Sequence, residues 1–166
     1  MSHRMRTGLV LAAVAAGVAE SALPRPFPFV RIGIANAVVI FALVRSGFLT
    51  ALQVSVVRVL AVGLFTGLLF TPVIALSIAG CATSLLVMYL ALPLSRRYIS
   101  LTAVSIMGAE ASLVSQLLVA SVLIPGLPAG TLLVPVTAWG MVSGAFVGLF
   151  SVALLRSAGA GLDYPC

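Results

Sequence analysis

The amino-acid sequence predicts an all-α, polytopic integral membrane protein, a bundle of about six transmembrane helices. Hydrophobic residues make up 62% of the 166 residues, and charged residues only 7%. Since a soluble domain carries about 25% charged residues, we expect the outer face of this chain to contact lipid. At about 20 residues per span, the length allows roughly six helices in one compact domain. Prolines and arginines divide the apolar sequence into six stretches, one for each expected helix.

The first three apolar stretches predict helices at residues 7–23, 32–44 and 48–65. After the first, prolines alternate with other residues over 24–28, which favours an extended connector. The second stretch covers only about 20 Å, short for a hydrocarbon core of about 30 Å. We therefore expect it to tilt inward as a partial span or to thin the membrane locally. The third ends before a Thr-Pro turn signal at residues 71–72.

The remaining stretches predict helices at residues 72–92, 99–124 and 131–155. Pro72 suits a first helical turn, and the Pro-Gly-Leu-Pro sequence after Ile124 ends the fifth helix. We expect residues 1–156 to form a single transmembrane domain and residues 157–166 a polar cytoplasmic tail.

The arginines predict the orientation of the chain. The N-terminus resembles a signal peptide, but five further hydrophobic segments favour its retention as the first helix. With the N-terminus inside, six arginines lie on the inner side (Arg4, Arg6, Arg45, Arg96, Arg97 and Arg156) and two on the outer side (Arg25 and Arg31). This distribution predicts that both termini are cytoplasmic. Because the arginines are dispersed rather than clustered, the net charge of +6 does not indicate a nucleic-acid partner.

Three charged residues, Glu20, Arg58 and Glu110, fall inside apolar stretches. Each costs roughly 2.5–3.5 kcal/mol at a helix centre, so we expect each to face protein or water. Each lies 13 or 14 residues beyond the arginine that opens its helix, a height of roughly 20 Å. Asn36 on the second helix reaches a similar level. The sequence therefore predicts a polar layer in the outer half of the membrane.

This layer allows two interpretations. In the structural one, Arg58 pairs with one glutamate and only fixes helix packing. In the functional one, the layer is an outward-opening site, because two acids and one base leave a charge for a ligand, an ion or a proton to satisfy. The candidate substrate-binding residues are then Glu20, Arg31, Asn36, Arg58, Glu110 and Gln116.

Small residues recur at four-residue spacing on two helices and predict close helix contacts. They are Gly140, Gly144 and Gly148 on the sixth helix, and Gly8, Ala12 and Ala16 on the first. Packing within the protomer is the expectation for the sixth helix. For the first helix, packing within the protomer and docking to a partner subunit both stay open.

The chain lacks the residues that several catalytic sites require. Without lysine it has neither a phosphate-binding GxxxxGK[ST] loop nor Schiff-base chemistry. One histidine, His3, and three acidic residues are too few for a histidine-based catalytic site, a metal site or an aspartate-rich magnesium site. We expect no enzymatic activity and no cofactor: the chain alone neither hydrolyses ATP nor condenses prenyl diphosphates.

Several segments resemble one small bacterial membrane family, the Gx transporter family, also called heptaprenyl diphosphate synthase component I. These segments are Ala19–Pro24 with Arg31–Asn36, Ser55–Leu60, Leu68–Pro72 with Leu76–Gly80, and Gly108–Gln116. The resemblance covers about residues 8–156 and places Glu20, Asn36, Arg58 and Gln116 on family motif positions. Where the family often has His-Asn before the glutamine, this chain has Ser112-Leu113, and it adds Glu110.

That family is similar to the S components of energy-coupling-factor vitamin transporters. The resemblance implies an S-component-like bundle in the bacterial cytoplasmic membrane, with a small solute in an outward-facing pocket and a separate coupling protein and ATPase as partners. The connector over residues 24–31 would act as a lid. The alternatives are a non-catalytic membrane subunit of heptaprenyl diphosphate synthase, and a structural membrane protein whose buried charges only lock packing.

Overall fold

The computed structural model describes residues 3–22, 33–95 and 98–157. Over these ranges all regular secondary structure is helical, which confirms the all-α class. They are α1 (His3–Ala22), α2 (Ile34–Ser46), α3 (Phe48–Phe65), α4 (Val73–Ser95), α5 (Leu101–Leu123) and α6 (Ala129–Ser157). Among the described residues, four helices (α3, α4, α5 and α6) are long and apolar enough to cross a membrane.

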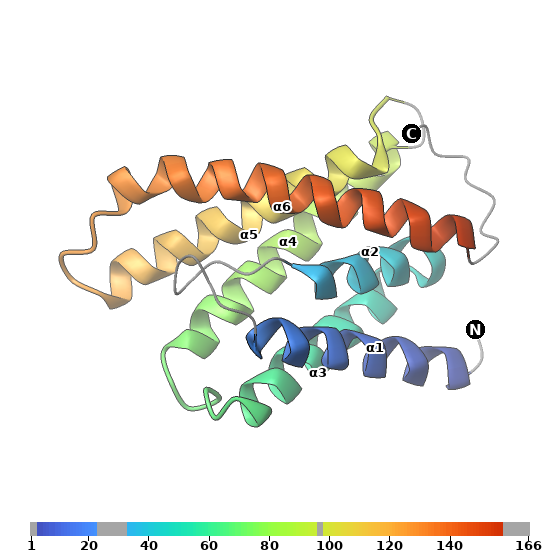
Figure 1. The fold of residues 1–166 in the computed structure, drawn as a ribbon, viewed down its shortest axis with the longest axis horizontal. Coiled ribbons are helices and arrows are strands. Elements are labelled where there is room, and N and C mark those ends of the chain that lie inside the picture. Colours follow the sequence, from blue (N-terminus) through green and yellow to red (C-terminus); the bar gives the residue numbers. More distant parts are fainter. Residues whose placement is uncertain (1–2, 23–32, 96–97, 158–166) are drawn as a thin grey trace.

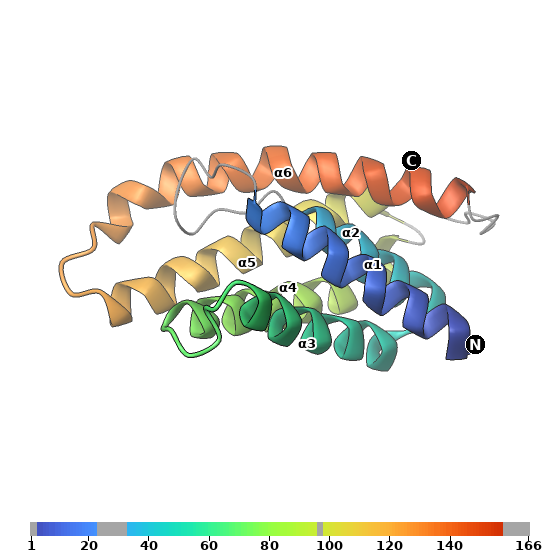
Figure 2. The same cartoon turned by 60° about the horizontal axis from the view of Figure 1, so that its bottom comes forward.

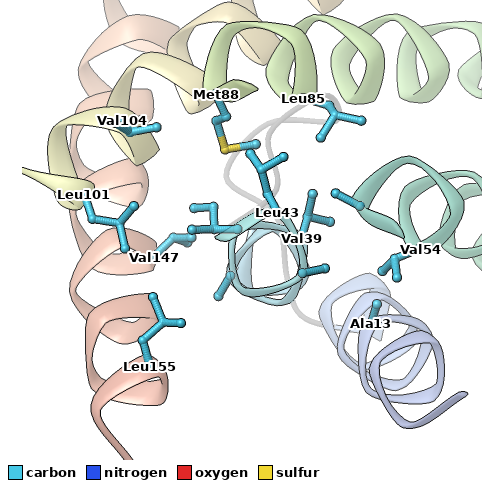
Figure 3. Packing of buried hydrophobic residues seen from close by; sticks show 14 of the residues in the cluster. Ala13, Val39, Leu43, Val54, Leu85, Met88, Leu101, Val104, Val147 and Leu155 are labelled. Atoms are coloured by element: carbon cyan, nitrogen blue, oxygen red, sulfur yellow. The ribbon is translucent and has the colours of Figure 1, made fainter. Parts of the chain in front are cut away.

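The short helix α2 lies at the centre of the bundle. It contacts α1, α3, α4 and α6, while α5 packs between α4 and α6 (Figure 1). Labelled side chains from the other five helices surround α2 in Figure 3. On α2 itself Ala37, Val39, Ile40, Ala42 and Leu43 are all buried. Neighbouring helices therefore cover this apolar helix of 13 residues, which is too short to span the hydrocarbon core by itself.

The predicted helix bounds are close to those of the structure. The third helix, predicted at 48–65, has these bounds in the structure. Helix α4 continues to Ser95, three residues beyond the predicted end, so Pro93 lies inside it. Membrane helices tolerate an internal proline where neighbouring groups satisfy the backbone carbonyl that it frees. Helix α1 begins at His3, four residues before the predicted start. The predicted connector at 24–31 and all but Ser157 of the predicted tail lie outside the described residues.

The first helix begins and the last helix ends on the same side of the molecule. The beginning of α1 and the end of α6 are found at one end of the bundle in both views (Figures 1 and 2). This agrees with an even number of crossings. Which side of a membrane this end faces stays a prediction.

Glycines allow α6 to lie close to α5. A Cβ atom built on Gly144 would come within 2.8 Å of the Ile106 Cα, and one on Gly148 within 2.7 Å of the Thr102 Cα. Real Cβ atoms do not approach backbone this closely, so only glycine fits at these positions. Gly140, Gly144 and Gly148 are all buried and face α5. Within the protomer, this glycine stripe therefore packs against α5.

Candidate polar cavity

A cavity of about 70 Å³ lies among helices α2 to α6. At about 10–15 Å³ per enclosed water, it has room for roughly five waters or for one polar group of a larger molecule. Its polar lining comes from all five helices: Asn36, Arg58, Ser77, Ser84, Ser105, Ser112, Gln116 and Ser143. None of the described residues that line it is acidic.

Arg58 supplies the charge of this cavity. Its side chain is only 8% exposed, and Nη1 donates a 2.7 Å hydrogen bond to Oδ1 of Asn36. Gly17 on α1 leaves room for Val62, since a Cβ atom there would lie 2.7 Å from the Val62 side chain, and it places α1 in van der Waals contact with Arg58. In the described part of the chain, Arg58 therefore has a neutral amide partner and no ion pair with Glu20 or Glu110. Among the described residues, the guanidinium is thus held by a neutral partner rather than by a direct ion pair.

Glu20 holds the start of α2 against the end of α1. Its carboxylate is 3% exposed, and Oε1 accepts a hydrogen bond from the backbone N–H of Gly33. Gly33 is the N-cap of α2 with φ of 84°, a conformation that favours glycine. A carboxylate near a helix N-terminus is stabilised by the helix dipole. Glu20 does not line the cavity, so its position is that of a support for the segment that carries Asn36.

Gln116 and Ser112 form the polar wall on α5. The Gln116 Nε2 atom donates to the Ser112 Oγ atom at 2.9 Å, and both residues line the cavity. Gly80 on α4 makes room for this pair, because a Cβ atom there would lie 2.8 Å from the Ser112 hydroxyl and closer still to Gln116. The amide and hydroxyl therefore pack against Gly80 where α4 and α5 meet at the cavity wall.

Ser84 provides an unpartnered hydroxyl at the cavity wall. Its side chain is 3% exposed, and its Oγ atom has no hydrogen-bond partner among the described residues. Buried hydroxyls are normally hydrogen-bonded, and an exception needs an explanation such as a water or a ligand. Together with Arg58, it gives the cavity two groups suited to binding a polar guest.

The other candidate residues lie elsewhere. Glu110 is not part of the cavity lining; its Oε1 atom packs against Gly140 on α6 and has no hydrogen-bond partner among the described residues. Gly8 and Ala12 are exposed on α1, and Ala16 is half-buried. Arg31 lies outside the described residues. The structure thus brings Asn36, Arg58 and Gln116 together at the cavity. Glu20 lies outside the lining and contacts Gly33, at the start of the helix that carries Asn36.

Sequence reasoning missed most of the serines in the cavity wall. Ser77 and Ser84 are seven residues apart on α4, and Ser105 and Ser112 are seven residues apart on α5. Seven residues are about two helical turns, so each pair lies on one face of its helix. This spacing is the signal that would have identified them.

A protein-family model matches most of this chain. The model of the heptaprenyl diphosphate synthase component I family matches residues 9–154. This chain belongs to that family. Among curated proteins and among solved structures, no match was found. The matched range holds every described cavity residue of this component I family member, from Gly33 to Val147.

The described lining of the cavity in this family member has several hydrogen-bonding groups and few groups for acid–base chemistry. Its lining offers a guanidinium, two side-chain amides and several hydroxyls. Guanidinium and amide N–H groups donate hydrogen bonds, and hydroxyls donate or accept them. Among the described residues, no three His, Cys, Asp or Glu side chains are grouped to hold a metal ion. The lining therefore suits a guest that is an anion or carries hydrogen-bond acceptors.

Proposed function

We propose that this chain is a membrane-embedded solute-binding subunit that holds an anionic group of its solute against Arg58. The observation that carries the proposal is the placement of one buried guanidinium in a cavity whose described lining contains donors and hydroxyls but no acid. Burying a charge without an opposite charge is expensive. A protein retains such a group where a bound anion supplies the missing partner.

The hydrogen-bond inventory of Arg58 supports this proposal. A guanidinium carries five N–H donors, and Asn36 accepts from Nη1 alone. Charge-assisted hydrogen bonds to a carboxylate or phosphate are short, strong and often bidentate. An anion in the cavity would engage donors of Arg58 that Asn36 leaves unused, and the Gln116 amide and Ser84 hydroxyl could bind its remaining oxygens.

In the cell, we propose, this subunit serves transport in the bacterial cytoplasmic membrane. The sequence resemblance to S components of energy-coupling-factor transporters supports a partnership with a coupling protein and an ATPase. The exposed small residues Gly8 and Ala12 on α1 support a docking face for such a partner, since small residues allow close approach of a second helix.

The test is to identify what the protein carries when it is purified from its native membrane. Small molecules released from the wild-type protein are compared by mass spectrometry with those from Arg58→Gln. Arg45→Gln is the matched control, because Arg45 is an exposed arginine at the end of α2 and lies outside the cavity. We expect an anionic molecule in the wild type and in Arg45→Gln, and its loss in Arg58→Gln. Equal recovery from all three proteins would refute the proposal.

The family name favours a second candidate function. As a component of heptaprenyl diphosphate synthase, this chain would be a non-catalytic membrane subunit that binds a soluble prenyltransferase. Co-purification separates the two candidates. Recovery of an aspartate-rich prenyltransferase with the tagged chain favours the synthase, whereas recovery of an ATPase and a coupling protein favours transport.

A further inference from the structure

A second, larger hollow lies directly beside the polar cavity. It is an apolar groove of about 240 Å³ between α3 and α4. Leu52, Val56 and Leu60 on α3 and Ile78 on α4 line it and are exposed at the outside of the bundle. Since α3 and α4 are long and apolar enough to span a membrane, the groove faces the hydrocarbon of the bilayer.

The groove and the polar cavity share part of their walls. Val59 on α3 and Cys81 on α4 line both. Val59 directly follows Arg58 in the chain, so the inner end of the groove lies next to the residue that carries the cavity's charge. Val59 and Cys81 therefore stand between the two hollows, with the polar, charged cavity inside the bundle and the apolar groove at its outside.

From this shared wall we infer that the ligand is an amphiphile, whose anionic head lies in the cavity at Arg58 and whose hydrocarbon chain passes between Val59 and Cys81 into the α3–α4 groove. The inference rests on the proposed function and adds to it the chemical class of the solute and its lateral route from the membrane. The occupant of the groove is a chain joined to the head in the cavity, because the groove adjoins the cavity that holds that charge.

The two parts contribute differently to binding. A hydrocarbon chain that moves from bilayer to groove stays in an apolar surrounding, so it gains little free energy. The anionic head gains charge-assisted hydrogen bonds in a site that excludes most water. Affinity should therefore depend on Arg58, while the groove decides which molecules can enter and where their chains lie.

Photocrosslinking of the full chain in lipid nanodiscs tests this. The probe is decyl phosphate with a diazirine at the end of its chain, and a decanol diazirine without phosphate is the neutral control. We expect the phosphate probe to label residues 52–60 and 78–85, and excess methyl phosphate to suppress that labelling. Arg58→Gln should reduce it by about tenfold or more, whereas Arg45→Gln should not.

A groove variant separates the chain from the head. Ala82 is exposed and lines the groove but not the cavity, so Ala82→Phe should remove labelling by the phosphate probe and preserve methyl phosphate binding measured by equilibrium dialysis. Ala138→Phe, at an exposed alanine on α6, is the matched control.

The outcomes distinguish the two proposals. If methyl phosphate binding depends on Arg58 but the phosphate probe labels the same positions as the neutral probe, the amphiphile inference fails and the anion site stands. If neither binding nor labelling depends on Arg58, the anion site fails, and the inference fails with it.

Discussion

The Arg58 guanidinium on α3 donates a 2.7 Å hydrogen bond to the side-chain oxygen of Asn36 on α2. Asparagine fixes the position of the arginine but leaves its charge in place, whereas an aspartate would neutralise it. The pairing of a buried cation with a neutral acceptor favours the proposed anion site over an ion pair that only stabilises packing.

Asn36→Asp tests this distinction. The substitution keeps the size of the side chain and gives Arg58 an opposite charge, so the free energy of unfolding should be maintained or should increase. Anion binding should fall at least about tenfold, because the new carboxylate competes for the guanidinium. Thermal unfolding and equilibrium dialysis with methyl phosphate measure the two effects. Undiminished anion binding in a folded Asn36→Asp protein would exclude Arg58 as the anion site.

Ser84→Ala tests the unpartnered hydroxyl in the cavity wall. Since the Ser84 Oγ atom has no hydrogen-bond partner among the described residues, its removal should leave the free energy of unfolding unchanged or slightly higher. The affinity for methyl phosphate, measured by equilibrium dialysis, should fall roughly twofold to tenfold, which is the range for the loss of one neutral hydrogen bond.

The control for Ser84→Ala is Ser151→Ala. Ser151 is fully buried on α6, its hydroxyl donates to the Val147 carbonyl at 2.7 Å, and it does not line the cavity. Its removal should leave ligand affinity unchanged. Equal affinity in the Ser84→Ala protein and the wild type would show that this hydroxyl has no part in binding.

The sequence predicted the helices and some of the cavity residues. What it could not predict has a physical reason. Apolar stretches bounded by proline and arginine set the bounds of α3 and placed Arg58 and Asn36 at one height. Height along a helix follows from a rise of about 1.5 Å per residue, but rotation about the helix axis does not. Glu110 was assigned to the same layer, yet it packs against Gly140 and lies outside the cavity lining.

The central position of α2 could not be derived from its sequence. A short apolar stretch is compatible with a buried helix, a tilted span or a re-entrant segment. The contacts of α2 with α1, α3, α4 and α6 select the first of these. Because α2 carries Asn36, this packing decides which side chains can meet Arg58, and only the three-dimensional structure supplies it.

Gly148→Ala should destabilise the contact between α5 and α6. The added Cβ atom would come within 2.7 Å of the Thr102 Cα, a backbone atom that cannot move without shifting the helix. We expect a loss of about 1–3 kcal/mol in the free energy of unfolding, as for other overpacked sites. Gly130→Ala is the control, because nothing lies within 4 Å of its Cβ position, and alanine there should be neutral or stabilising. The expectation fails if both variants unfold alike.

The last prediction concerns two adjacent alanines on α1 that face opposite surroundings. Ala12 is exposed, whereas Ala13 is fully buried in the core around α2. Ala13→Leu should therefore overpack the core and lower the free energy of unfolding by about 1–3 kcal/mol. Ala12→Leu should leave folding intact but prevent close approach of a partner helix to the small-residue face that begins at Gly8.

Co-purification of partner proteins from native membranes, read beside thermal unfolding, checks this pair. Ala138→Leu, at an exposed alanine on α6, controls for added apolar surface. If Ala12→Leu loses its partners and Ala138→Leu retains them, the exposed face of α1 is a docking surface, because only that face has changed shape. If Ala12→Leu retains every partner of the wild type, the small residues of α1 have no docking role, and any coupling subunit must bind another face of the bundle.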